Sequence, residues 1–433
     1  METPTSDPTV TIAPAIILTN KVKNEEFKIW KKTVPSLYEH IWNLKPTYAS
    51  SDPKVQRTIA FSDEIEKNES RGILTTSVLY AQSDKIYKIE NSLPLGAQYK
   101  VMSDDNRLAE PNYYGLENEM ASQYSWVFAN ETIQKIIYLR ADSFIVISES
   151  GNMGWFSSEL MQPNKKFVDE ECEGSDERYD FDVSKDFKTV VKSSGKRANM
   201  IQVVNSDAEV TRRWTLPSDC KIQSVRFLDD SLFGACCDDN TIKFYDLNSV
   251  NDNPLWTLDY KNNEDSSDNL VFFEVSPLVN TLFATGSNKG HISLWDIRTI
   301  AGNAVTVGSE SSPREIVQFD HLDNSVVADI KFSPTTASQL LTVDGSGRIY
   351  HWDLENLFSK GDESQEEMSD EEIQSDCLTF LHTGGFYNNT DASSQNRAVI
   401  RIAYHPIIDG LISVVNNDGL LTVYKAFTGK HKK

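Results

Sequence analysis

Short runs in which apolar and polar residues alternate recur along most of the chain, and they predict strands. Three segments align closely: CDDNTIKFYDL (237–247), SNKGHISLWDI (287–297) and DGSGRIYHWDL (344–354). Each begins with a polar turn that contains Gly or Asn and continues as a strand that ends in an aromatic residue and Asp. A fourth copy, NNDGLLTVYKA (416–426), has Lys425 in place of that Asp, and a fifth, 149–159, keeps less of the pattern.

Each of these segments is the end of a longer unit. Two apolar runs precede it, and a further strand before those is marked by an aromatic residue, namely Trp126, Trp214, Trp256, Phe319 or Phe380. Degenerate units at 73–91 and 180–205 bring the number of units to seven. Four-stranded units with a Trp-Asp signature, repeated at roughly 40 residues, are typical of a WD-repeat β-propeller. The sequence therefore predicts an all-β, seven-bladed propeller over residues 45–427, and a two-sheet sandwich with similar hairpins is the alternative.

The last unit is incomplete, because it ends after its third strand at residues 424–427. The alternating segment KVQRTIAFSDE (54–64) has no unit of its own. We expect 54–64 to supply the outer strand of the last blade, since an unpaired strand edge invites association with other chains. Residues 1–23 are predicted to be a disordered N-terminus, and residues 428–433 are a short basic tail.

Residues 24–44 differ from the rest of the chain because their apolar positions follow helical spacing. Asn24 can cap the helix, and acidic residues follow it in the first turn. Pro35 removes a hydrogen bond in a helix interior, at a cost of about 3 kcal/mol, and so predicts a kink. We expect a kinked amphipathic helix packed on the flank of the propeller. Its apolar stripe consists of Phe27, Trp30, Val34, Leu37, Tyr38 and Ile41.

The charge of the chain argues against some partners. With 42 Lys and Arg against 64 Asp and Glu, the formal net charge is −22. Nucleic acids and anionic membranes are recognised by clustered cations, so neither is expected as a direct ligand. Basic partners are favoured, although such a charge can also serve only to keep the protein dispersed.

The cysteines indicate a reducing compartment, and the apolar runs indicate neither a membrane span nor a secretion signal. Five cysteines without a CxxC pair or a regular spacing to histidine predict neither a disulfide framework nor a zinc site. Apolar runs near the N-terminus are far shorter than the roughly 20 residues of a membrane span, and a charged region typical of a secretion signal is missing. The expected location is the nucleus or the cytosol.

Residues 361–376, GDESQEEMSDEEIQSD, form an acidic insertion with no basic residue. One interpretation is a solvated loop without a partner. The other is that the insertion and the leading helix form a groove that attracts a basic helix over long range. A second acidic stretch, 169–182, has the same two interpretations.

Several of these segments resemble a known family. EEFKIWKK (25–32), LYEH (37–40), and YHWDLENL followed by the acidic insertion and LTFLHTGG (378–385) are similar to the histone-binding, retinoblastoma-associated WD-repeat proteins. In that family the helix and the loop form a groove for a basic histone helix. The family's Trp-Pro after the helix and the paired prolines of its loop are missing here. With TVPSLYEHIWNLKPTYAS (33–50), these departures resemble the divergent fungal branch of WD-repeat transcriptional modulators.

The resemblance implies a docking subunit of a nuclear histone deacetylase corepressor complex that represses transcription, including that of meiotic genes. The implied partners are corepressor scaffold and histone deacetylase subunits and histones H3 and H4, with no direct DNA binding, no membrane contact and no cofactor. The implied alternative is a nuclear anchor or transport adaptor that retains another enzyme, such as the ribonucleotide reductase small subunit. The residues implied to bind a partner are Phe27, Trp30, Lys31, Leu37, Tyr38, Ile41, Asp362, Glu363, Glu366, Glu367, Asp370, Glu371, Glu372 and Asp376.

The sequence contains no catalytic motif that would change this interpretation. The seven histidines are scattered over different units, and the sequence contains no nucleophile elbow, phosphate loop or HExxH motif. We therefore expect no enzymatic activity and no bound metal. A catalytic propeller built from blade loops is the third alternative.

Overall fold

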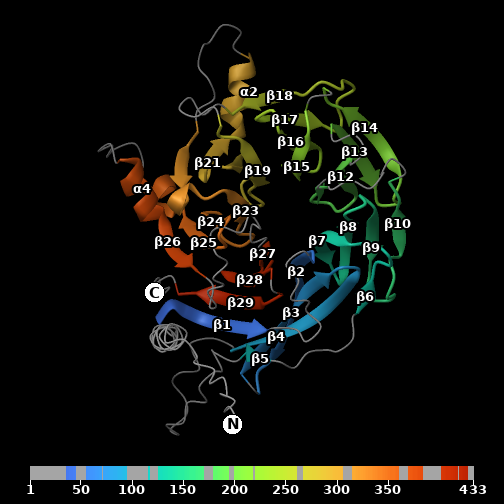
Figure 1. Ribbon diagram of the computed structural model, residues 1–433, viewed down its shortest axis with the longest axis vertical. Coiled ribbons are helices and arrows are strands. Elements are labelled where there is room, and N and C mark those ends of the chain that lie inside the picture. The colour runs from blue at the N-terminus through green and yellow to red at the C-terminus, as the bar shows by residue number, and fades with distance from the viewer. Residues whose placement is uncertain are drawn as a thin grey trace, which may run out of the picture.

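Seven sheets, antiparallel apart from one short strand, surround a central axis in the computed structural model (Figure 1). The structure describes residues 36–44, 55–70, 72–94, 116–117, 125–169, 179–194, 199–217, 220–260, 267–305, 315–359, 369–383, 401–417 and 419–427. The predicted seven-bladed, all-β propeller is confirmed. Among the described residues, no helix has the length and apolar character that a membrane crossing requires.

Each blade runs from an inner strand at the axis to an outer strand at the rim. Blade 1 contains β2 (Arg57–Asn68), β3 (Ile73–Gln82), β4 (Lys85–Pro94) and β6 (Trp126–Val127). Blade 2 contains β7 (Ile133–Arg140), β8 (Ser143–Ser148), β9 (Met153–Phe156) and β10 (Lys165–Phe167). Blade 3 contains β11 (Phe181–Val183), β12 (Thr189–Ser194), β13 (Met200–Asn205) and β14 (Val210–Thr215). Blade 4 contains β15 (Ile222–Phe227), β16 (Leu232–Cys237), β17 (Thr241–Asp246) and β18 (Trp256–Asp259).

The remaining blades follow the same plan. Blade 5 contains β19 (Leu270–Val275), β20 (Leu282–Ser287), β21 (His291–Asp296) and β22 (Val317–Asp320). Blade 6 contains β23 (Val327–Phe332), β24 (Gln339–Asp344), β25 (Ile349–Asp353) and β26 (Leu378–His382). Blade 7 contains β27 (Arg401–Tyr404), β28 (Leu411–Val415), β29 (Leu421–Ala426), β1 (Tyr38–Leu44) and the short parallel strand β5 (Leu116–Glu117). The described helices are α2 (Ile297–Val305), α3 (Glu355–Ser359), α4 (Asp370–Cys377) and the 3-10 turn η2 (Leu322–Asn324).

The sequence repeat is shifted by one strand relative to the blades. The aromatic residue that marks the first strand of each unit, the marker aromatic, lies in the outer strand of one blade. The aromatic residue that ends the last strand of the same unit, the closing aromatic, lies in the next blade. Phe319 of blade 5 stacks on Trp352 of blade 6 with ring centroids 4.5 Å apart. Trp214 of blade 3 likewise contacts Tyr245 of blade 4 at 5.9 Å. The repeated aromatic residues therefore bind neighbouring blades together, which explains their spacing.

Blade 7 is closed by β1, so the prediction that 54–64 closes it was wrong. β1 pairs antiparallel with β29, with Ile41 opposite Tyr424. Residues 57–62, in contrast, form the first half of β2, the inner strand of blade 1, and all six are buried. β1 already occupies the edge of β29 that the prediction gave to 54–64, and residues 57–62 pair with β3 instead.

The prediction of a helix over 24–44 was also wrong for residues 38–44. Ser36 and Leu37 are helical, but residues from Tyr38 onward form a strand with a bulge between Tyr38 and His40. The free edge of β29 presents backbone donors and acceptors that β1 satisfies, and this pairing overrides the helical spacing of the side chains. Residues 24–35, like 1–23, 361–368 and 428–433, lie outside the described residues.

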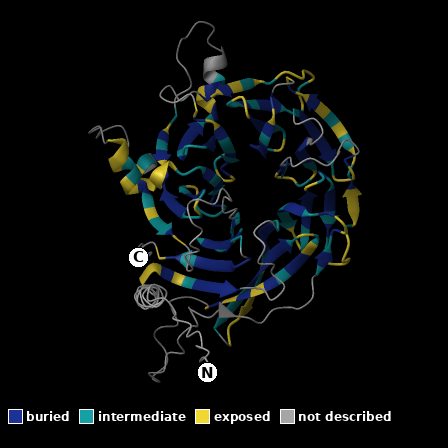
Figure 2. Cartoon of the chain, in the orientation of Figure 1, coloured by how far each residue is buried: buried dark blue, intermediate teal, exposed yellow. Residues whose placement is uncertain are grey.

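Both faces of β1 are packed against neighbouring blades. Tyr38 and Ile41 pack with residues of blade 6 such as Leu341. Trp42 and Leu44 pack with residues of blade 1 such as Ile59. Figure 2 shows the buried residues along the sheets and the exposed residues on rim turns and on α4. The ends of the ring are thus joined by backbone pairing and by two apolar clusters.

Candidate partner-binding surface

Helix α4 occupies the second half of the acidic insertion, so the loop predicted there was wrong for residues 370–376. Ser369 begins the helix with a capping box. Its hydroxyl accepts a hydrogen bond from the backbone N–H of Glu372 at 3.3 Å, and the Glu372 carboxylate accepts one from the Ser369 N–H at 3.0 Å. Asp370 and Glu371 lie in the first turn, where the helix dipole favours negative charge. The acidic residues therefore stabilise the helix that presents them.

Gln374 fastens α4 to the outer edge of blade 5. Its side-chain oxygen accepts a hydrogen bond from the backbone N–H of Asp320 at 2.8 Å, and its amide N–H donates to the Asp320 carbonyl at 3.1 Å. This amide provides the donor and acceptor that another strand would offer to the edge of β22. On the inner side of the helix, Cys377 is buried and Ile373 packs against the cluster between blades 5 and 6. The acidic side of α4 is consequently held outward.

The strand and turn next to α4 add further negative charge. The Asp320 side chain is 51% exposed, and that of Asp323, in η2, is 80% exposed. His291 and Arg348 contact these carboxylates at 2.5 and 3.0 Å, respectively. The exposed Leu322 lies between the two aspartates in the chain. We call this surface the acidic edge; it consists of Asp320, Asp323, Asp370, Glu371, Glu372 and Asp376.

The N-terminal strand begins beside the same blade. The Tyr38 hydroxyl forms a 2.7 Å hydrogen bond with Nδ1 of His382, the last residue of β26. The Tyr38 ring also meets the Phe380 ring edge-on at 5.3 Å. Because α4 leads directly into the other end of β26, the acidic edge and the start of β1 flank one outer strand (Figure 1).

Buried histidines hold this seam in place. The rings of His382 and Tyr424 stack with centroids 4.3 Å apart, and His351 Nε2 lies 2.8 Å from the Tyr424 hydroxyl. Burial lowers the pKa of His382 to about 4. Burial, and to a lesser degree the neighbouring His382, lowers the pKa of His351 to about 3. Both rings are therefore neutral at physiological pH, and their partners are structural tyrosines.

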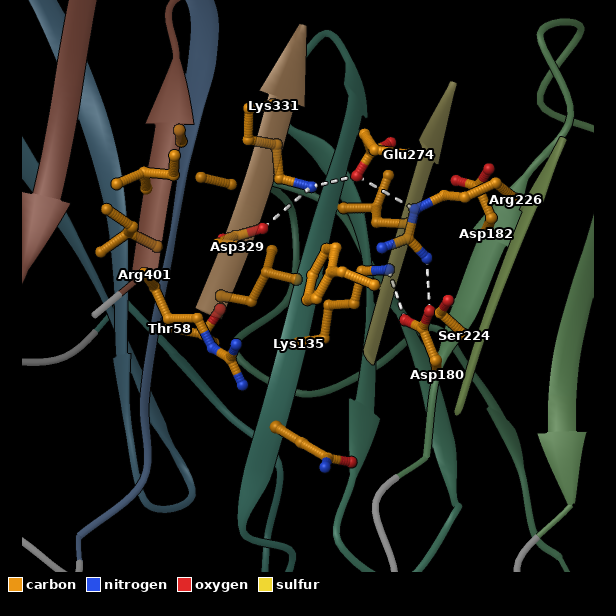
Figure 3. Close-up of a pocket in the computed structure, with 18 of the residues that line it drawn as sticks. Thr58, Lys135, Asp180, Asp182, Ser224, Arg226, Glu274, Asp329, Lys331 and Arg401 are labelled. Carbon is orange, nitrogen blue, oxygen red and sulfur yellow. Dashed lines mark hydrogen bonds and ion pairs between the residues drawn. The ribbon is translucent and has the colours of Figure 1, made fainter. Parts of the chain in front are cut away.

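A second feature is the cavity of about 970 Å³ at the axis of the ring. Charged side chains from blades 2 to 6 form a continuous chain of contacts there (Figure 3). Lys331 contacts Glu274 at 2.6 Å, Glu274 contacts Arg226 at 3.1 Å, Arg226 pairs with Asp180, and Asp180 contacts Lys135 at 2.6 Å. Burial alone would raise the pKa of Asp180, but the charges of Arg226 and Lys135 outweigh it and lower that pKa. We call these five residues the ion-pair belt.

The belt joins inner strands rather than forming an acid–base site. Its opposite charges alternate from blade to blade, so each charge neutralises its neighbours. The sequence carries a signal for the ion-pair belt. Arg226, Glu274 and Lys331 are each a single charge between apolar residues at the same position of the inner strand in successive blades.

The comparisons with known proteins decide the family. No protein-family model matches the sequence. The chain is 33% identical to the transcriptional regulatory protein UME1 of Saccharomyces cerevisiae, over 95% of both chains. It is 32% identical to the transcriptional modulator WTM2 of the same yeast, over 92% of this chain and 94% of that one. The chain belongs to the family of these yeast transcriptional regulators.

The resemblance to the fungal WD-repeat transcriptional modulators is thereby confirmed, and a role in transcription regulation follows from it. A more distant relative is the histone acetyltransferase type B subunit 2 of Debaryomyces hansenii, 23% identical over 93% of this chain and 90% of that one. This relative agrees with the predicted likeness to histone-associated propellers.

For this family member, the predicted partner-binding residues fall into four groups. Tyr38 and Ile41 are 8% and 0% exposed, so they stabilise the closure of the ring and offer little surface to a partner. Leu37 is 39% exposed at the start of β1. The predicted residues of α4 are exposed, namely Asp370, Glu371, Glu372 and Asp376. The remaining ones lie outside the described residues, namely Phe27, Trp30, Lys31, Asp362, Glu363, Glu366 and Glu367.

Proposed function

We propose that this transcriptional regulator is a non-catalytic docking subunit of a nuclear corepressor complex that contains a histone deacetylase and represses transcription, including that of meiotic genes. The observation that carries the proposal is the acidic edge, which α4 holds outward at the rim of blades 5 and 6. The relatives of this protein are named for transcription regulation, and one more distant relative is named as a subunit of a histone acetyltransferase. These names support a partner within a chromatin complex.

The ligand we propose for the acidic edge is a basic or amphipathic helix from a corepressor scaffold, a deacetylase subunit or histone H3 or H4. Carboxylates exposed to water attract such a helix over long range, which raises the association rate more than the final affinity. Salt screens this attraction beyond about 8 to 10 Å, so association should slow as the ionic strength rises. Leu322, which is 50% exposed between Asp320 and Asp323 in the chain, offers an apolar contact beside these carboxylates.

The proposal can be tested by reversing charge on α4. The double variant Asp370→Lys and Glu371→Lys removes two exposed carboxylates that follow the capping residue. A matched control reverses Glu66 and Asp259, two exposed acidic residues on blades 1 and 4, with the same change in net charge. We expect the α4 variant, but not the control, to lose most of its co-purifying deacetylase and histones from nuclear extract at low salt.

Equal recovery by both variants would contradict the proposal. Thermal unfolding of the two variants should be measured alongside, because lysines in the first turn also weaken the helix by about 0.3 to 1 kcal/mol each. Mass spectrometry of the captured proteins separates the alternatives. A metabolic enzyme together with an import receptor would indicate the adaptor role instead.

A further inference from the structure

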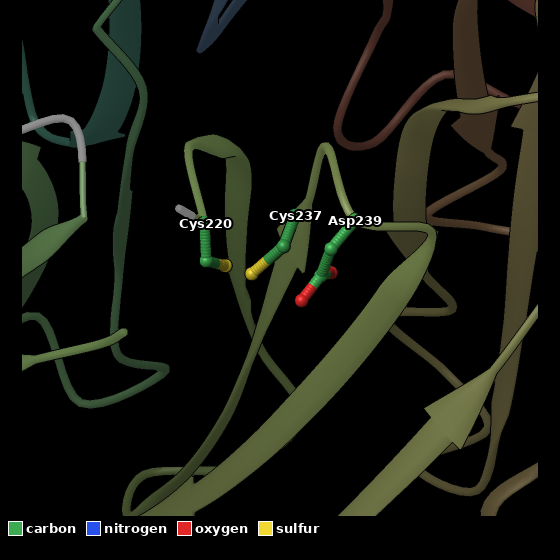
Figure 4. Close-up of side chains that lie close together, drawn as sticks. All are labelled: Cys220, Cys237 and Asp239. Atoms are coloured by element: carbon green, nitrogen blue, oxygen red, sulfur yellow. The ribbon is translucent and has the colours of Figure 1, made fainter. Parts of the chain in front are cut away.

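The fold assembles a group of metal-binding side chains in blade 4 that sequence spacing does not reveal. β15 and β16 pair with Ile222 opposite Cys237. The pairing continues one step further, because the Asp238 N–H donates to the Lys221 carbonyl at 2.9 Å. Cys220 therefore lies opposite Asp239, with Cys237 as its diagonal neighbour on the same face of the sheet. Figure 4 shows Cys220, Cys237 and Asp239 pointing into a common space.

The distances in this group suit a metal ion. The Sγ atoms of Cys220 and Cys237 and a carboxylate oxygen of Asp239 all lie within 4.8 Å of one another. A tetrahedral Zn²⁺ ion, with bonds of about 2.3 Å to sulfur and about 2.0 to 2.2 Å to oxygen, needs ligand atoms about 3.5 to 3.8 Å apart. Small side-chain rotations reach that geometry. A disulfide is less suitable, because diagonal partners are about 7 to 8 Å apart at Cα, beyond the usual limit of about 6.8 Å.

A cation already lies beside these ligands. The ammonium group of Lys243 is 2.8 Å from Asp239 Oδ2 and 3.7 Å from Cys220 Sγ. Cys220 and Cys237 are 1% and 0% exposed, whereas Asp239 is exposed. An ion would therefore enter from the Asp239 side and meet two thiols shielded from water.

We propose that Cys220, Cys237 and Asp239 bind a thiophilic divalent cation such as Zn²⁺, and that the Lys243 ammonium moves aside as the ion enters. Both cysteines bind as thiolates, so binding releases the thiol protons to solvent. Water occupies the fourth position. The inference is independent of the docking function, because blade 4 contributes nothing to the acidic edge.

Cobalt provides the probe for this site. The full-length protein, reduced and freed of metal by a chelator, is titrated with Co²⁺ under argon. We expect thiolate-to-cobalt charge-transfer absorption that saturates at one equivalent and disappears when Zn²⁺ is added. Cys220→Ser and Cys237→Ser should lose the absorption. Cys236→Ser is the control, since Cys236 is equally buried but lies on the opposite face of β16.

Two results would overturn the proposal. One is a wild-type protein that shows no such absorption in excess Co²⁺, and the other is a Cys220→Ser variant that shows the same absorption as Cys236→Ser. Lys243→Met keeps all three ligands and so remains informative even if a cysteine variant unfolds. We expect it to bind Co²⁺ more tightly than the wild type. An unchanged or higher dissociation constant would refute the exchange of ammonium for metal.

Discussion

The ion-pair belt allows a sharp test of what holds the blades together at the axis. Asp180 accepts hydrogen bonds from Lys135 at 2.6 Å, from Arg226, and from the Val225 backbone N–H at 3.1 Å. It thus connects blades 2, 3 and 4 through a single carboxylate. The substitution Asp180→Asn preserves the shape of the side chain but removes its charge.

The expected loss of folding stability in Asp180→Asn follows from the burial of Asp180 and Arg226. The side chains of Asp180 and Arg226 are 12% and 5% exposed, so the asparagine leaves Arg226 and Lys135 with one fewer carboxylate to balance their buried charge. Removing one partner of a buried ion pair costs about 3 to 5 kcal/mol. We expect a value near the lower end, about 3 kcal/mol, because Arg226 keeps its contact with Glu274.

The matched control is Asp207→Asn. Asp207 contacts Lys165 at 2.7 Å, but these side chains are 70% and 46% exposed. An exposed pair contributes about 0 to 1 kcal/mol, so this variant should unfold nearly like the wild type. The measurement is equilibrium unfolding in urea, followed by the fluorescence of buried tryptophans such as Trp214.

A second substitution identifies the cause of the loss. Adding Lys135→Met to Asp180→Asn removes one of the cations left unpaired, so the double variant should recover part of the lost stability. The inference that the belt joins the blades fails if Asp180→Asn and Asp207→Asn lower the free energy of unfolding equally. It also fails if the double variant is less stable than Asp180→Asn.

Three further expectations concern the seam and the acidic edge. Ile41→Ala, at a fully buried position, should reduce the free energy of unfolding by about 2 to 5 kcal/mol, whereas Leu37→Ala should change it by less than about 0.5 kcal/mol; equal effects in urea unfolding would argue against closure by β1. His351 and His382 are neutral when folded, so stability should be constant above pH 6.5 and fall between about pH 6.5 and 4, by about 1.4 kcal/mol per pH unit for each ring; a flat profile of urea midpoints would contradict this. Gln374→Ala should expose α4 to hydrogen exchange while the melting temperature of the ring stays within a few degrees, and unchanged protection of α4 would refute its role as the clamp.

The repeats were predictable because each unit contains all the information for its own hairpins. Turn, alternating strand and closing aromatic recur in the same order, and the marker aromatics recur because neighbouring blades stack them. The closing strand was not predictable in this way, since β1 pairs with β29, which lies almost 400 positions later in the chain. The side-chain spacing of residues 38–44 is also compatible with a helix, and the free edge of β29 decides for a strand there.

The acidic edge was predictable by charge but not by shape. The eight carboxylates of the insertion indicated an exposed segment, yet the capping pair of Ser369 and Glu372 was overlooked as a helix signal. Gln374 carries no signal at all, because its role depends on β22 lying beside it. The metal-binding group of blade 4 was missed for the same reason, as Cys220 and Cys237 meet only through the pairing of β15 with β16.

Closure by β1 also changes the relation between stability and partner binding. Had 54–64 closed the ring, the segment before it would have been free to take any position on the flank. In the structure Tyr38 is instead fixed to His382, at the opposite end of β26 from α4, so the start of β1 and the acidic edge share one rigid support. Ile41→Ala should therefore weaken both the ring and the proposed docking, whereas Asp370→Lys with Glu371→Lys should weaken docking and the local stability of α4 but leave the ring intact. A variant of β1 that lowers stability but leaves partner capture at its full level would show that the two surfaces act independently.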